Sequence, residues 1–109
     1  MCSNSEFCTF KPMIRHSVIF TLHAPIGSAG ASEFLSAAAK LRSIPGVRNF
    51  ESLRQTSKKN DYDYGLSMEF DTAEDYADYN IHPDHKAFIQ NYWLPNVTKF
   101  LEIDFEPIA

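Results

Sequence analysis

Residues 62–70 read YDYGLSMEF, the clearest strand pattern in the chain. The positions between its apolar side chains are acidic or small. Successive side chains of a strand point to opposite faces, so this stretch is predicted to be a strand with one buried face. The apolar side chains lie at every second position, at Tyr62, Tyr64, Leu66, Met68 and Phe70.

Residues 14–22 alternate in the same way and predict another strand, the first along the chain. One face carries His16 among apolar side chains. A strand with weaker alternation is expected at residues 47–55, and a further strand at residues 100–105. The last of these alternates Leu101, Ile103 and Phe105 with Glu102 and Asp104. The predicted apolar face of the strand at residues 14–22 is formed by His16, Val18, Phe20 and Leu22.

Helices are predicted between these strands. Ser32 is a candidate cap for a helix that runs to about Ser43, which Pro45-Gly46 ends. Thr72 and Asp75 have capping-box spacing at the start of a short helix. Pro83 opens a further helical stretch that Pro95 disrupts. On that stretch the apolar stripe is formed by His85, Phe88, Ile89 and Tyr92.

The element order is therefore β-α-β-β-α-β, which is the ferredoxin-like pattern of an α+β domain. Such a domain has a four-stranded antiparallel sheet with both helices on one face. The other face is left to solvent or to a partner.

Composition excludes several function classes. The chain has 109 residues, a net charge of −4 and no basic cluster longer than Lys58-Lys59, so nucleic-acid binding is not expected. No apolar run is long enough for a bilayer span, and residues 1–12 lack the features of a signal peptide. A cytoplasmic location is the expectation.

Both cysteines, Cys2 and Cys8, lie in the first twelve residues. We expect residues 1–12 to form a reduced tail and residues 13–109 to form the domain, although a Cys2–Cys8 bridge is conceivable.

Two histidines and a tyrosine are the candidate chemical groups. His16 and His85 lie on apolar faces that would pack together, which would bring both imidazoles into one interior. Neutral imidazole is a usable general base, and a phenol can donate to a forming enolate. The hypothesis assigns His85 as base, Tyr79 as electrophilic donor and His16 as a positioning group. The alternative is that both histidines are hydrogen-bonded core residues.

A metal site at His82 and His85 is the weaker idea. The two histidines are three residues apart, but His82 precedes Pro83 and is expected to point elsewhere. No metal and no cofactor are predicted.

Several segments resemble the Dabb family of stress-responsive dimeric α/β-barrel domains. The most specific match is residues 79–88, YNIHPDHKAF, with the H-P-x-H-x-x-F motif. The early His16, the turn at Ile44-Pro45-Gly46-Val47 and the closing Ile103-Asp104-Phe105 are similar too. The resemblance covers Ile14 to about Pro107.

The resemblance implies a homodimer in which two sheets form one barrel. One plant branch of the family closes polyketide chains in a pocket between sheet and helices, using a Y-x5-H pair. Carried over, that pair is Tyr79 and His85, and His16 lines the pocket. The sequence departs from this branch at Tyr64, where the branch has histidine, and in the first helix at Phe34. The remaining implied pocket positions are Val18, Phe20, Leu66 and Phe88.

Two function classes follow. The first is a homodimer whose apolar pocket binds, and by lyase- or cyclase-type chemistry converts, a small aromatic or polyketide-like molecule. The second is a non-enzymatic stress-associated protein with a filled core. A cofactor-free monooxygenase-like barrel is a further option by analogy of fold alone.

Overall fold

The computed structural model describes residues 13–108. The predicted tail, with Cys2 and Cys8, lies outside these residues. The predicted order of strands and helices is confirmed. The helical bounds are α1 Ala29–Ala39, η1 Lys40–Ser43, α2 Ala73–Ile81, α3 Pro83–Phe88, η2 Ile89–Trp93 and α4 Leu94–Asn96; the strands are β1 Ile14–Leu22, β2 Arg48–Arg54, β3 Tyr64–Phe70 and β4 Val97–Phe105.

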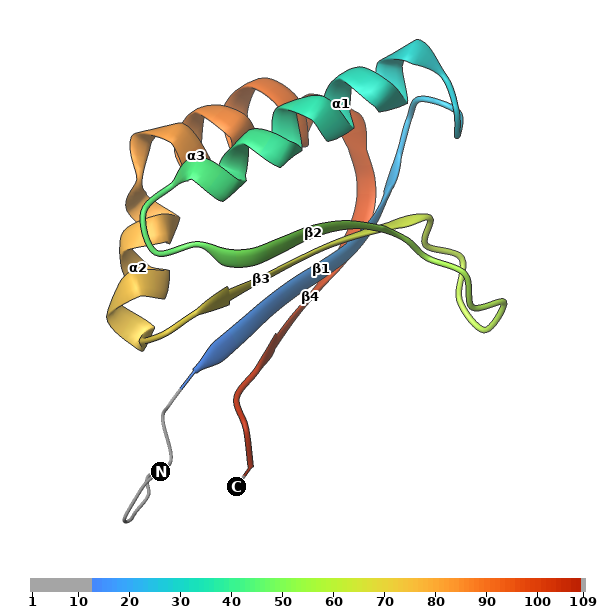
Figure 1. Cartoon of the computed structure of the whole chain (residues 1–109). Coiled ribbons are helices and arrows are strands. Elements are labelled where there is room, and N and C mark those ends of the chain that lie inside the picture. Colours follow the sequence, from blue (N-terminus) through green and yellow to red (C-terminus); the bar gives the residue numbers. More distant parts are fainter. Residues whose placement is uncertain (1–12, 109) are drawn as a thin grey trace.

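The strands form one antiparallel sheet in the order β2-β3-β1-β4, and the helices cover one of its faces (Figure 1). This is the predicted ferredoxin-like arrangement. β1 is central and pairs with β3 on one side and β4 on the other. Residues directly opposite each other share a face, so the register defines rows of side chains beneath the helices. The three rows are Met68–His16–Asp104, Leu66–Val18–Glu102 and Tyr64–Phe20–Phe100.

The first helix begins earlier than the sequence suggests. Its N-cap is Ser28, whose hydroxyl accepts a hydrogen bond from the Ala31 backbone N–H at 3.2 Å, whereas Ser32 is exposed inside the helix. The prediction that Ser32 caps this helix is wrong because Gly30, taken as a loop residue, is tolerated in the first turn. The predicted cap at Thr72 is confirmed, since its hydroxyl accepts from the Asp75 N–H at 3.0 Å.

An aromatic cluster fills the core between sheet and helices. Phe20 from β1 is fully buried, with its ring 5.5 Å from Phe34 of α1 and 5.1 Å from Trp93. Closer to α2, Phe70 stacks on Tyr76 with ring centroids 5.0 Å apart. Burial of several rings supplies much of the apolar area removed from water in a domain of this size.

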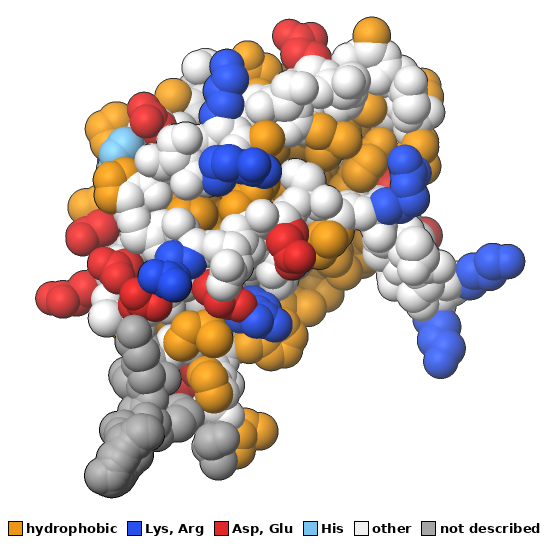
Figure 2. All heavy atoms as spheres, viewed as in Figure 1, with side chains coloured by type: hydrophobic (Ala, Val, Ile, Leu, Met, Phe, Trp, Pro, Cys, Tyr) orange, Lys and Arg blue, Asp and Glu red, His pale blue; other side chains and the backbone are white. Residues whose placement is uncertain are grey.

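The sheet face away from the helices is uncovered and contains apolar side chains. Leu101, Ile103 and Phe105 of β4 point to this side, opposite Ile19, Ser17 and Arg15 of β1. Their exposed fractions are 47%, 36% and 54%. In Figure 2, apolar side chains gather along the lower edge of the sheet. We call this surface, formed by Ile19, Leu53, Leu101, Ile103 and Phe105, the open face.

Candidate functional site

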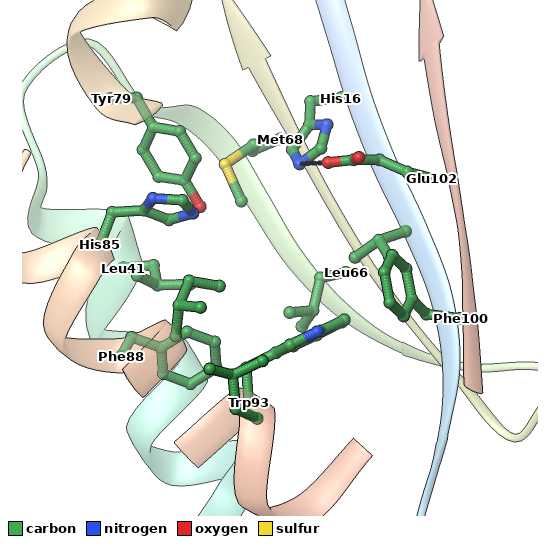
Figure 3. Close-up of a pocket in the computed structure, with 13 residues that line it drawn as sticks. His16, Leu41, Leu66, Met68, Tyr79, His85, Phe88, Trp93, Phe100 and Glu102 are labelled. Atoms are coloured by element: carbon green, nitrogen blue, oxygen red, sulfur yellow. Dashed lines mark ion pairs between the residues drawn. The ribbon is translucent and has the colours of Figure 1, made fainter. Parts of the chain in front are cut away.

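A pocket of about 310 Å³ lies between the sheet and the C-terminal helical stretch (Figure 3). Most of its wall is apolar, and its polar groups come from a few side chains that point toward the same space. It is lined by His16, Val18, Leu41, Leu66, Met68, Tyr79, His85, Phe88, Ile89, Trp93, Leu94, Phe100 and Glu102.

The sheet register determines which strand residues reach the pocket. His16 lies opposite Met68, and Val18 lies opposite Leu66, so these four side chains form adjacent positions of one floor. On the other side of β1, Val18 lies opposite Glu102. The pocket therefore lies mainly over the first two rows of the sheet, and Phe100 of the third row also lines it.

The helical stretch supplies the opposite wall. His85 and Phe88 reach the pocket from α3, as the predicted stripe requires. The following residues, Ile89–Trp93, form a π-helical turn. Such a turn accommodates an extra residue compared with an α-helix, so the face shifts by about one position. Trp93 consequently lines the pocket, whereas Tyr92, the last residue of the predicted apolar stripe, does not.

Six of the seven predicted pocket positions line this pocket: His16, Val18, Leu66, Tyr79, His85 and Phe88. Phe20, the seventh, does not line it. Its exposed fraction is 0%, and it lies in the third row of the sheet, where Phe34 and Trp93 pack against it. Strand alternation predicts the correct face for Phe20 but not how far along the strand the helices close over it.

Tyr79 and His85 lie side by side on this wall, with ring centroids 4.4 Å apart. His85 Nδ1 is 3.2 Å from the backbone carbonyl oxygen of Asn80, which can only accept, so Nδ1 carries the hydrogen and Nε2 is left with a lone pair. Burial lowers the pKa of His85 below its usual range, although the Asn80 carbonyl opposes the shift. The imidazole is therefore neutral at pH 7.

Tyr79 is almost fully buried, and burial raises the pKa of its hydroxyl above the usual range, with the charge of Glu102 as a smaller cause. The phenol therefore keeps its proton and can act only as a hydrogen-bond donor or acceptor. Among residues 13–108 no group holds its hydroxyl in a hydrogen bond. That hydrogen is available to a bound molecule.

His16 is held from behind by a carboxylate and a phenol. Its Nδ1 is 2.7 Å from Asp104 Oδ1 and 2.9 Å from the Tyr76 hydroxyl. The Tyr76 hydroxyl in turn donates to Asp104 Oδ2 at 2.9 Å. Because the carboxylate can only accept, Nδ1 carries the imidazole hydrogen and the ring orientation is fixed.

Glu102 lies on the other side of the His16 ring. Its Oε2 is 3.7 Å from His16 Nε2 (Figure 3). The Glu102 side chain is 56% exposed, whereas that of His16 is 8% exposed. Glu102 therefore lies at the rim of the pocket and brings a negative charge to it.

Sequence reasoning missed Tyr76, Glu102, Asp104 and Trp93 as site residues. Glu102 and Asp104 were assigned only to the polar positions of the last strand. The sequence pattern that could have identified Glu102 and Asp104 is that this strand carries two acidic residues on one face and three apolar residues on the other. The larger apolar set belongs to the open face, and the acidic set faces the helices.

The two histidines of the weaker metal hypothesis make different contacts. His82 Nδ1 accepts from the Asp84 backbone N–H at 3.1 Å, as the N-cap of α3, whereas His85 is bonded to Asn80. Within residues 13–108 no group of three metal-ligating side chains is found. In the same part of the chain, no helix has the length and apolar character needed to cross a bilayer.

A family model described as the stress responsive A/B barrel domain, Dabb, matches residues 14–107. The chain belongs to the Dabb family. No curated protein matches it. Among solved structures, a Dabb protein with a ferredoxin-like fold from Mesorhizobium loti is 50% identical, with a TM-score of 0.89 over 91% of this chain and 100% of the other.

More distant structures share the fold of this chain. A dimeric ferredoxin-like protein of unknown function from Thermobifida fusca is 22% identical, with a TM-score of 0.74 over 89% of this chain and 92% of the other. A hydroxynitrile lyase from Passiflora edulis is 12% identical, with a TM-score of 0.76 over 87% and 93%. At these identities the likeness is one of fold alone.

Proposed function

We propose that this Dabb protein binds a small, largely apolar molecule in the pocket. We further propose that His85 and Tyr79 act on this molecule by acid–base catalysis. The observation that carries the proposal is the convergence of His16, Tyr79 and His85 on one pocket of about 310 Å³. This volume is at the lower end of the range typical of small-molecule sites. It favours a ligand built around an aromatic ring or a short folded chain.

The proposal gives each group a role. The free Nε2 of neutral His85 takes a proton from a carbon next to a carbonyl group. The Tyr79 hydroxyl donates a hydrogen bond to the enolate oxygen that forms. His16, held by Asp104, positions the substrate from the sheet side. Removal of a carbon-bound proton with stabilisation of the oxyanion is the first step of aldol-type ring closure and of lyase reactions that eliminate a group next to a carbonyl.

This step can be tested without the natural substrate. Phenylacetone in deuterated buffer exchanges its carbon-bound protons next to the carbonyl when a base removes them. The protein should accelerate this exchange, measured by loss of the proton NMR signal. Loss of one general base typically costs a factor of roughly 10² or more. His85→Asn should therefore abolish most of the acceleration, and Tyr79→Phe should reduce it.

His23→Asn is the matched control, because His23 is exposed and does not line the pocket. Acceleration that survives in His85→Asn, or that falls equally in His85→Asn and His23→Asn, would refute the assignment. If the native protein gives no acceleration at all, the catalytic proposal fails, and the non-enzymatic alternative becomes the better description. That alternative requires a filled core, and the open pocket counts against it.

We further propose that the protein forms a homodimer through the open face. The exposed apolar side chains of this face are the kind of patch that marks an interface, and a two-fold arrangement would bury the same patch on both copies. The dimeric description of the Thermobifida fusca structure supports this proposal.

Ile103→Asp tests the dimer, because it places a charge in the middle of the open face. We expect this variant to sediment as a monomer while the native protein sediments as a dimer. Ile81→Asp is the control, since Ile81 is 65% exposed on α2, on the helical side of the sheet. A native monomer, or a dimer that tolerates Ile103→Asp, would disprove the arrangement.

A further inference from the structure

His16 and Glu102 bring two hydrogen-bond acceptors together on the pocket wall. Asp104 accepts the Nδ1 hydrogen of His16, so in the neutral form of the imidazole the opposite ring nitrogen, Nε2, has a lone pair. The nearest oxygen of Glu102 is 3.7 Å from this nitrogen. An ionised carboxylate has no hydrogen to give, and the distance is too long for a direct hydrogen bond. Both acceptors can therefore serve a third group.

The charges near this pair have one sign. Glu102 lines the pocket, and Asp104 lies directly behind the His16 ring. Among the described residues that line the pocket there is no lysine or arginine. A negatively charged ligand group placed beside His16 would face a carboxylate without a balancing cation. A hydroxyl or ammonium group would instead donate to both acceptors at once.

We propose, on the basis of the ligand pocket proposed above, that His16 and Glu102 select ligands by their polar end. The preferred ligand combines an apolar body, which fits against Leu66 and Trp93, with a hydroxyl or amine group that lies between His16 and Glu102. Carboxylates of the same size are rejected. Glu102 thus determines specificity rather than supplying chemistry.

Four probes of nearly equal size test this selection: phenethylamine, phenylethanol, phenylacetate and ethylbenzene. Trp93 is the single tryptophan of the chain and lines the pocket, so its fluorescence reports binding. We expect phenethylamine and phenylethanol to bind more tightly than phenylacetate. Phenethylamine should bind with at least about fivefold higher affinity than phenylacetate. A much larger difference is not expected, because the half-exposed carboxylate of Glu102 contributes only modestly to binding.

Glu102→Gln removes the charge and keeps the shape. In this variant the preference of phenethylamine over phenylacetate should fall to about twofold or less, whereas ethylbenzene should bind as before. Glu33→Gln is the matched control, because Glu33 is an exposed residue of α1 that does not line the pocket. It changes the net charge equally and should leave the preference unchanged. An equal effect of both variants would overturn the inference.

A pocket-filling variant separates this inference from the proposed function. Val18→Phe narrows the pocket and should weaken all four probes, and Leu66→Phe replaces it if the first variant does not fold. Binding that these variants do not affect, or no binding by any probe, would refute the ligand pocket itself. The other outcome is that these variants weaken binding but the native protein shows no preference for the amine or the alcohol over the carboxylate. That outcome would refute only the selection by His16 and Glu102.

Discussion

His16 Nδ1 and Asp104 Oδ1 lie 2.7 Å apart, on the neighbouring strands β1 and β4. The two residues are cross-strand partners, so backbone pairing of the sheet places them on the same face. The contact joins a nearly buried imidazole to a carboxylate whose side chain is 44% exposed. It fixes which nitrogen of His16 faces the pocket.

Asp104→Asn should loosen this arrangement, because an amide can donate to Nδ1 as well as accept from it. We expect nitrogen NMR of the imidazole to show a mixture of tautomers in place of the Nδ1-protonated form. The free energy of unfolding should fall by about 1 kcal/mol, since the contact is charge-assisted but partly exposed. Asp78→Asn, at an exposed position of α2, is the control and should change neither quantity.

Tyr76→Phe should separate the contribution of the Tyr76 hydroxyl to stability from that of its ring. The variant removes the hydrogen bond to Asp104 but retains the stacking on Phe70. A loss of about 1 kcal/mol in denaturant unfolding is expected. Tyr76→Ala should cost more, because it also removes the ring. Equal losses for the two variants would show that the hydroxyl carries all of the contribution and the stacking carries none.

Stability should depend on pH through His85. Because burial lowers the pKa of His85 in the folded protein, the unfolded chain binds a proton at a higher pH than the folded one. Folding stability is then fully present above the ordinary histidine pKa of about 6.5 and decreases as pH falls toward the lowered folded pKa. His85→Gln should reduce this decrease. Unfolding curves at several pH values for both proteins provide the test, and identical pH profiles would contradict it.

The start of α1 offers a matched pair of serines. Ser28→Ala should cost about 1 kcal/mol, because it removes the oxygen that caps the Ala31 N–H. Ser32→Ala should change stability by less than about 0.5 kcal/mol, since Ser32 is exposed within the helix. Thermal unfolding of both variants measures the difference. The reverse order would place the helix start where the sequence pattern suggested it.

Local patterns were sufficient for the elements and for the inward direction of His16 and His85. Strand alternation places His16 on the helix-facing side of β1, and helical spacing places His85 beside Phe88. These periodicities are local properties, so a single sequence reveals them. The pairing of Tyr79 with His85 followed from family resemblance, and the structure places their rings side by side.

Long-range register was not predictable in the same way. The contact between His16 and Asp104 joins residues 88 positions apart, and it depends on where β4 begins opposite β1. A shift of one residue would turn Asp104 and Glu102 to the open face. Tyr76 reaches the same contact only because α2 crosses above this row of the sheet. No local pattern contains that information.

Because of the π-helical turn at Ile89–Trp93, a change of chain length at this point would alter the shape of the pocket. The wide turn places Trp93 and Leu94 on the pocket wall. Because such a turn holds one residue more than an α-helical turn, we expect removal of one residue within it to restore α-helical winding and to rotate both side chains relative to the cavity. Insertions and deletions usually destabilise a packed helix, but here we expect a single-residue deletion to give a differently shaped cavity. The binding space could thus diversify between relatives by a change of length, with every surrounding side chain retained.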